Sequence, residues 1–186
     1  MRKTNIVLML CVLFCWTCSA QKESSKLIWK NFDFSDAGIK VSLPCEPSKS
    51  VKTFQEEPKL AQVYKYSCEK EVLKFSISLA EHFGGFSQSE VKDAIDGVER
   101  VMREGIKNNA NISTKDTIFQ TYSAREFDIK NETMLARNLH VQNKRGAYNV
   151  QMIFQRKQNQ SDEDFNTEFQ STAQKLFESL TISGKE

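Results

Sequence analysis

The sequence predicts an α+β protein in which an antiparallel β-sheet is covered by two main helices. Several short segments alternate apolar and polar residues, as half-buried strands do. Two longer segments, from Ser87 to Asn108 and from Ser161 to Leu180, carry apolar residues at helical spacing. No repeat or linker interrupts the order strands, helix, strands, helix, so we expect one globular domain over residues 21–186.

Residues 1–20 are predicted to be a cleavable signal peptide. Arg2 and Lys3 supply positive charge, residues 6–16 are almost entirely apolar, and small residues precede Gln21. The apolar run is shorter than the roughly 20 residues that a membrane-spanning helix needs, and no later segment approaches that length. We therefore expect an exported mature chain, secreted or periplasmic, without a membrane span.

Cys18 is the candidate for lipidation if the signal belongs to a lipoprotein. A lipobox places a cysteine directly after the apolar run, and diacylglycerol is attached to its sulfur. Cys15, Trp16 and Thr17 precede Cys18, whereas the usual pattern has Leu at minus three and Ala or Gly at minus one. A lipid anchor therefore stays open as an alternative to release of the cleaved chain.

The mature chain is electrically neutral. Of the 26 Lys and Arg residues, Arg2 and Lys3 lie in the signal, which leaves 24 basic side chains against 24 acidic ones. Nucleic acids and anionic membranes are held mainly by clustered Lys and Arg, so this balance gives no reason to expect a nucleic-acid partner. The 39% share of hydrophobic residues predicts a packed core and excludes a disordered chain.

Cys45 and Cys68 are the two cysteines of the mature chain, because the other three fall within the signal. In an oxidising compartment they are expected to form a disulfide, provided that the strands that carry them are neighbours. Two unpaired buried thiols are the alternative.

The first half of the mature chain predicts strands and then a helix. The segments 27–34 and 39–43 are interpreted as strands, with Pro44 ending the second. The segments 61–68 and 73–79 alternate most clearly and predict an antiparallel hairpin. Ser87 then forms a capping box with Glu90, which marks the start of the first helix.

The second half predicts three strands and a second helix. The strands contain residues 127–129, 135–141 and 148–154, and the glycine-containing turn 143–146 joins the last two. Ser161 caps the final helix, which has three acidic residues in its first turn and Phe165, among others, on its apolar side.

This order of elements resembles the PsbP-like fold family, which includes extrinsic photosystem proteins, a Ran-binding nuclear import factor and many exported bacterial proteins. The segment Gly38-Ile39-Lys40-Val41-Ser42-Leu43-Pro44 is similar to the family's early G-x-x-V-x-x-P stretch. The later strands from Arg137 to Phe154 and the final helix resemble its carboxy-terminal half. The resemblance implies a PsbP-like α/β/α sandwich, and its members act mostly by binding other proteins.

The motifs of known enzymes are absent from the sequence. It contains no GxSxG, no P-loop lysine and no HExxH, so no catalytic residue and no cofactor is predicted. A metal site is not expected, because two cysteines alone do not complete a zinc shell and neither His82 nor His140 lies at ligand spacing from them. His82, beside Gly84-Gly85, is a weak candidate for anion binding at a helix start.

We therefore expect an exported, non-enzymatic domain that binds a partner protein or a small ligand. One alternative is a membrane-anchored structural lipoprotein. Another is a secreted enzyme with a site on the open face of the sheet, built from His140 with Arg137 or Tyr148.

Overall fold

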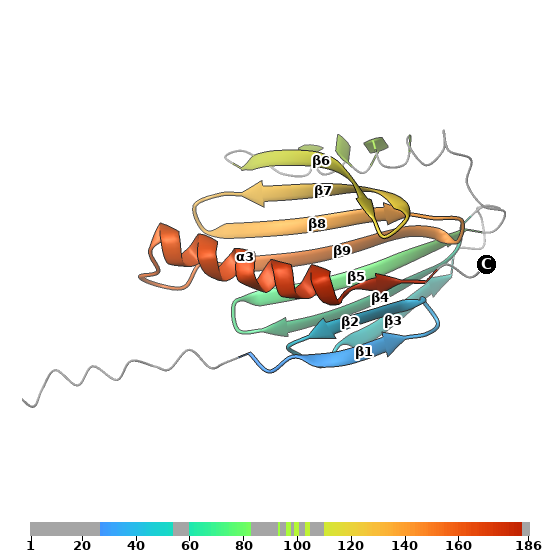
Figure 1. Cartoon of the computed structure of the whole chain (residues 1–186), viewed down its shortest axis with the longest axis horizontal. Coiled ribbons are helices and arrows are strands. Elements are labelled where there is room, and N and C mark those ends of the chain that lie inside the picture. Colours follow the sequence, from blue (N-terminus) through green and yellow to red (C-terminus); the bar gives the residue numbers. More distant parts are fainter. Residues whose placement is uncertain are drawn as a thin grey trace, which may run out of the picture.

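The computed structural model describes residues 27–53, 60–82 and 110–183, together with residues 93, 96–97, 99–100 and 103–104. Two antiparallel sheets and the helix α3 make up most of this part of the chain (Figure 1). In chain order the elements are β1 (Lys30–Phe34), β2 (Ile39–Leu43), β3 (Ser48–Thr53), β4 (Leu60–Lys70), β5 (Leu73–His82), β6 (Asn111–Phe119), β7 (Tyr122–Lys130), β8 (Met134–Gln142), β9 (Gly146–Gln155), α3 (Asp162–Ser179) and β10 (Thr181–Ile182).

The larger sheet has seven strands in the order β3-β4-β5-β9-β8-β7-β6. Its two central hairpins, β4–β5 and β8–β9, meet where β5 pairs with β9. This central pairing places Phe75 opposite Met152 and Ile77 opposite Val150. Because successive side chains of a strand point to opposite faces, each strand contributes to two faces. We call the face that α3 packs on the inner face and the other the outer face.

The inner face is apolar and closed from solvent at its centre. Its buried residues come from the four strands β4, β5, β8 and β9: Tyr66, Cys68, Leu73, Phe75, Ile77, Leu79, Leu135, Leu139, Val141, Tyr148, Val150, Met152 and Phe154. Burying such side chains stabilises the fold by about 1.5 to 3 kcal/mol each relative to exposure. The core of the molecule therefore lies on this side of the sheet.

The helix α3 covers part of the inner face. Its N-cap Ser161 accepts a hydrogen bond from the Asp164 backbone N–H at 3.1 Å, as its position before three acidic residues predicts. Phe165 stacks on Phe154 with 5.4 Å between ring centroids. Leu180, which caps the other end, leads directly into β10.

The smaller sheet, in the order β1-β2-β10, covers the rest of the inner face. Ile39, Val41 and Leu43 of β2 are buried in the same core as the large sheet. Two aromatic contacts fix the layer, one between Phe34 and Tyr66 at 3.9 Å and one between Trp29 and Phe75 at 6.1 Å, both between ring centroids.

The expected sheet covered by two main helices is wrong, and so is the expected PsbP-like α/β/α sandwich. The part of the chain that the structure describes is mostly β-strand, with α3 as the one helix described from end to end. The physical reason is that the strands β1, β2 and β10 form a second sheet, which buries the apolar surface beside α3. Alternation predicts that a segment is a strand but does not tell to which sheet it belongs.

The predicted first helix lies mainly outside the described residues, and those of its residues that are described, between 93 and 104, are helical. Both predicted hairpins and the final helix are confirmed. The strand β6 was not predicted. Within the described residues, no helix combines the length and the apolar character needed to cross a membrane.

Candidate binding site

A groove lies on the inner face beside α3. The helix covers the middle of the large sheet and leaves the inner face of β6, β7 and part of β8 uncovered (Figure 1). The groove has a volume of about 450 Å³, within the usual range for ligand sites. Its lining residues are Phe119, Glu126, Arg137, Leu139, Gln170, Gln174, Phe177 and Glu178.

The floor of the groove is apolar and one wall is a face of the helix. Leu139 is buried, and Phe119 and Phe177 are partly buried against the core. Gln170 and Gln174 stand four residues apart, so they lie on one side of α3 and present amide groups along the groove. An apolar floor with a few polar groups at its rim is typical of binding sites for amphipathic ligands.

The cation of the groove, Arg137, is already paired. Its Nε and Nη2 atoms each donate to a carboxylate oxygen of Asp128 at 2.7 Å. These hydrogen bonds raise the pKa of Arg137 above its usual value. Its guanidinium also lies 5.7 Å from the centre of the Phe169 ring. Arg137 is therefore held in place by the protein, and its charge is balanced.

Two carboxylates of the groove, Glu126 and Glu178, have no ion-pair partner among the described residues. Glu178 accepts a hydrogen bond from the Gln174 amide at 2.7 Å. Glu126 lies close enough to Arg137 to raise the pKa of that guanidinium further. The Arg137–Asp128 pair is neutral, so these two carboxylates make the lining of the groove negative, while Lys115 of β6, which lies opposite Glu126 in register, is outside the lining.

The residues of the enzyme hypothesis do not come together. His140 pairs across the sheet with Asn149 on the outer face, whereas Arg137 and Tyr148 belong to the inner face. His140 is only 3% exposed, and its burial, with a smaller contribution from Arg125, lowers its pKa to about 4. A site on one face built from His140 with Arg137 or Tyr148 is therefore wrong.

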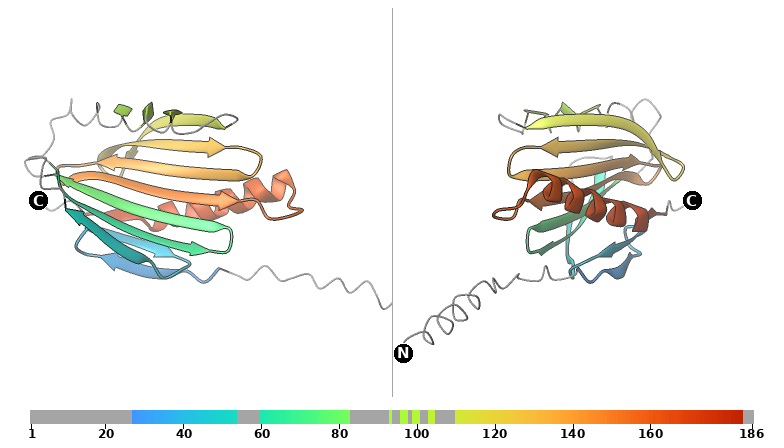
Figure 2. Two further views of the ribbon diagram at one scale, coloured as in Figure 1. Left: turned by 180° about the vertical axis from the view of Figure 1, so that it is seen from behind. Right: turned by 60° about the vertical axis from the view of Figure 1, so that its left-hand side comes forward.

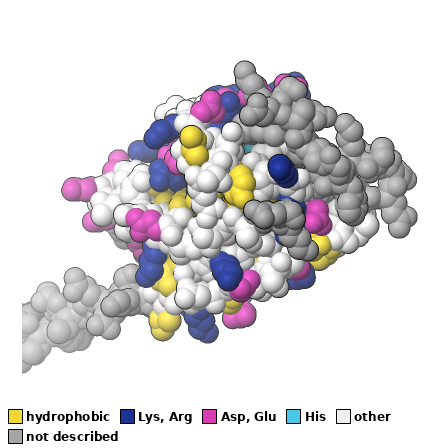
Figure 3. Space-filling view, turned by 45° about the vertical axis from the view of Figure 1, so that its right-hand side comes forward, with side chains coloured by type: hydrophobic (Ala, Val, Ile, Leu, Met, Phe, Trp, Pro, Cys, Tyr) yellow, Lys and Arg dark blue, Asp and Glu magenta, His cyan; other side chains and the backbone are white. Residues whose placement is uncertain are grey.

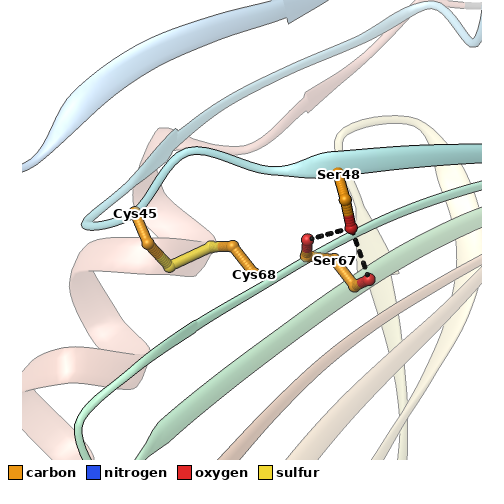
Figure 4. The surroundings of a disulfide bond; sticks show 4 residues. All are labelled: Cys45, Ser48, Ser67 and Cys68. Carbon is orange, nitrogen blue, oxygen red and sulfur yellow. Dashed lines mark hydrogen bonds between the residues drawn. A yellow bond between two sulfur atoms is a disulfide. The ribbon is translucent and has the colours of Figure 1, made fainter.

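The disulfide between Cys45 and Cys68 is present (Figure 4). It joins the connection between β2 and β3 to the inner face of β4. The predicted signal peptide and Cys18 lie outside the described residues, as does the side chain of His82. No group of three or more potential metal ligands occurs in the described ranges.

A buried ionic cluster at one end of the sheets was not predicted. The Arg145 side chain is 5% exposed, donates to Glu81 at 2.9 Å, and also donates to the backbone carbonyl of Asp36. Burial raises the pKa of the Asp36 carboxyl, but hydrogen bonds from Lys49 and Tyr66 outweigh this and hold it below its usual value. The cluster joins the β1–β2 turn to the large sheet, and we assign it a structural role, although the Nη1 atom of Arg145 is buried without a hydrogen-bond partner.

The surface shows no large area of one charge on the side drawn in Figure 3, where basic and acidic side chains are interspersed and hydrophobic ones are isolated. This agrees with the balance of 24 basic and 24 acidic side chains in residues 21–186. Of the described large hydrophobic side chains, Ile28, Val51 and Ile118 are exposed.

Comparisons with known proteins leave the family open. No protein-family model matches the chain, and no curated protein matches it. Among solved structures, the chain is similar to PA94 from Pseudomonas aeruginosa, a protein of unknown function. The two are 9% identical, the match covers 78% of this chain and 92% of that chain, and the TM-score is 0.42. These comparisons do not test the PsbP-like resemblance of the sequence, whereas the α/β/α sandwich that it implies is contradicted by the fold.

Proposed function

We propose that this chain is an exported, non-enzymatic binding protein whose groove beside α3 takes an amphipathic, positively charged segment of a partner protein. The observation that carries the proposal is the pair of carboxylates, Glu126 and Glu178, which lie above an apolar floor and form no ion pair among the described residues.

The apolar floor of the groove favours a ligand with an apolar part. The partly buried rings of Phe119 and Phe177 offer surface that gains about 25 cal/mol for each Å² removed from water. The volume of about 450 Å³ accommodates a few side chains rather than a folded domain. An extended segment or a helical turn of a partner therefore fits better than a broad protein surface.

The charges that line the groove favour a positively charged ligand. Asp128 accepts two hydrogen bonds from Arg137 and balances its charge, so an anionic ligand would meet two carboxylates that form no ion pair and be repelled. A Lys or Arg side chain would instead form ion pairs at a partly desolvated rim, where charges affect both affinity and rate of association.

Export of the protein is supported by the features of the first twenty residues and by the disulfide, which is typical of oxidising compartments. Whether the chain is released or anchored through Cys18 is open. The intact mass of the native product tests both alternatives, because diacylglycerol on Cys18 adds a large, defined mass. A product that begins at Met1 would contradict export.

The groove is tested with synthetic ten-residue peptides that alternate Leu with either Lys or Glu. We expect the Lys peptide to bind and the Glu peptide to bind at least tenfold more weakly, as measured by fluorescence anisotropy. Glu126→Gln and Glu178→Gln should each weaken the Lys peptide about threefold to tenfold and reduce its salt dependence.

The matched control is Glu132→Gln, an exposed glutamate in the turn between β7 and β8, which should leave the affinity unchanged. Equal binding of the two peptides, or equal loss in all three variants, would show that the groove does not select for charge and would refute the proposal.

A further inference from the structure

A row of hydroxyl and amide side chains crosses the outer face of the large sheet. Ser48, Ser67, Ser76, Gln151 and Asn138 come from five adjacent strands and are paired in register, each with the next. We call these five residues the outer stripe. Neighbouring strands lie about 4.8 Å apart, so the stripe presents polar groups at regular spacing over about 20 Å.

Four of the five residues line an open hollow. The hollow has a volume of about 500 Å³ and is lined by Ser48, Ser67, Ser76 and Gln151, with Ile153 beside them. It lies on the outer face of the sheet. The left panel of Figure 2 shows this face in front and α3 behind it. The disulfide holds the edge of this hollow, because Cys68 follows Ser67 directly and Cys45 lies just before β3 (Figure 4).

The polar groups of the stripe are only partly used by the protein. The Ser48 hydroxyl donates to the Ser67 carbonyl at 3.0 Å, and the two hydroxyls are 3.4 Å apart (Figure 4). Within the described ranges, the side chains of Ser76 and Gln151 form no hydrogen bond with other residues. They are therefore available to a ligand in the hollow.

The buried end of the outer stripe has polar groups without hydrogen-bond partners. Asn138 is fully buried, yet neither its amide nitrogen nor its amide oxygen has a hydrogen-bond partner. In the next row, both ring nitrogens of His140 and the side-chain oxygen of Asn149 are also buried without partners. Leaving such groups unsatisfied is unfavourable, so a polar network that starts in the hollow and reaches Asn138 through Gln151 would stabilise the protein.

The charges around the hollow exclude a strongly ionic ligand. Lys74 pairs with Glu69 at 3.1 Å. The remaining charged side chains of the lining, Lys65 and Glu46, have opposite signs and balance one another. A purely apolar ligand is also disfavoured, because it would leave the hydroxyl and amide groups unpaired.

We propose that the outer stripe is a second binding site, separate from the groove, and that its ligand is a neutral saccharide. Each sugar hydroxyl both donates and accepts a hydrogen bond, which matches a row of serine hydroxyls and carboxamides. The C–H face of a sugar ring can lie against Ile153. A linear chain of two or three sugar units spans the row of exposed side chains.

The test uses three trisaccharides of different linkage, namely chitotriose, cellotriose and maltotriose. Each is titrated into the full mature protein while backbone and side-chain amide signals are followed by NMR. We expect at least one trisaccharide to shift the signals of Ser76, Gln151 and Asn138. Ser76→Ala and Gln151→Ala should each weaken its binding by about fivefold.

Two controls separate this site from the groove. Ser113→Ala changes an exposed serine on the inner face of β6 and should leave saccharide affinity unchanged, as should Glu126→Gln in the groove. If no trisaccharide shifts the stripe signals, or if Ser76→Ala and Gln151→Ala both bind the trisaccharide as tightly as the wild-type protein does, the stripe holds ordered water only and the proposal is overturned.

Discussion

The two faces of the seven-stranded sheet are built from the same strands but bury different chemistry. On the inner face, alternate residues such as Ile77, Val150 and Leu139 are apolar and pack against α3 and the small sheet. On the outer face of β8, the residues between them are Asn138, His140 and Gln142, each at most 3% exposed and without a hydrogen-bond partner. The inner face therefore stabilises the fold, whereas the outer face retains unused hydrogen-bonding capacity.

The difference between the two faces indicates where binding sites can occur. Apolar packing is non-directional and tolerates no ligand once it is closed, so the inner face can bind only beside α3, where the helix leaves it open. Unsatisfied polar groups reduce stability and persist where another contribution outweighs them. Both proposed sites follow from this contrast, one at the margin of the inner face and one along the outer face.

The largest expected effect is the loss of stability when a buried side chain is removed from the inner face. Phe165→Ala removes a fully buried ring from α3 and leaves Phe154 facing a cavity, so the free energy of unfolding should fall by about 3 to 5 kcal/mol. Urea unfolding followed by circular dichroism measures it. Ile118→Ala, at a side chain that is 76% exposed, should change stability by less than about 0.5 kcal/mol. Similar losses in both variants would contradict the assignment of the core.

The next effect tests how the edge of the large sheet is held. Replacing both Cys45 and Cys68 by Ser should lower the free energy of unfolding by roughly 3 kcal/mol, because the crosslink restricts the unfolded chain. The wild-type protein should lose a similar amount when unfolded in dithiothreitol. The double variant should be insensitive to the reductant, and a reductant effect that persists in it would contradict this explanation.

The buried imidazole of the outer face predicts a dependence of stability on pH. Burial, with a smaller contribution from Arg125, holds the pKa of His140 at about 4 in the folded state, below the value of about 6.5 in the unfolded state. The unfolded state therefore binds more protons between these values, and stability falls as pH falls. Between pH 7 and pH 5 the loss from His140 should be about 2 kcal/mol.

The comparison with His140→Gln isolates this contribution from that of the carboxylates. Arg125, which faces His140 from β7 and pairs with Asp96, Glu99 and Asp116, stays charged throughout the range. The variant should therefore show a flatter pH profile by about the same 2 kcal/mol. Parallel profiles for the two proteins would mean that folding does not lower the pKa of His140.

The smallest expected effect tests how the N-cap stabilises α3, the helix that covers the inner face. Ser161→Ala removes the hydroxyl that accepts from the Asp164 N–H, so unfolding free energy should fall by about 1 kcal/mol. Ser171→Ala, at an exposed serine within the same helix, should be neutral or slightly stabilising. An equal loss in both variants would show that the cap itself contributes nothing.

The sequence allowed the central hairpins and α3 to be predicted because each has a strong local signal. The run from Leu73 to Leu79 alternates without a break, and Ser161 precedes three acidic residues and an apolar stripe. β6 was missed because it is an edge strand with exposed residues on both faces, such as Thr114 and Lys115, so it carries no alternation. The site was missed for a related reason, since Glu126 and Glu178 are 52 positions apart along the chain and meet only through the packing of α3 on β7 and β8.

Local pattern thus determined the strands of the two central hairpins and the start of α3, and composition determined the balanced charge of residues 21–186. Tertiary structure alone decided that β1, β2 and β10 form a separate sheet, that His140 and Arg137 face opposite ways into different environments, and that a groove remains beside α3. The physical reason is the distance along the chain over which each interaction acts. Capping and alternation act between residues a few positions apart, whereas the choice of sheet and the placing of charges depend on contacts that form only when distant segments pack together.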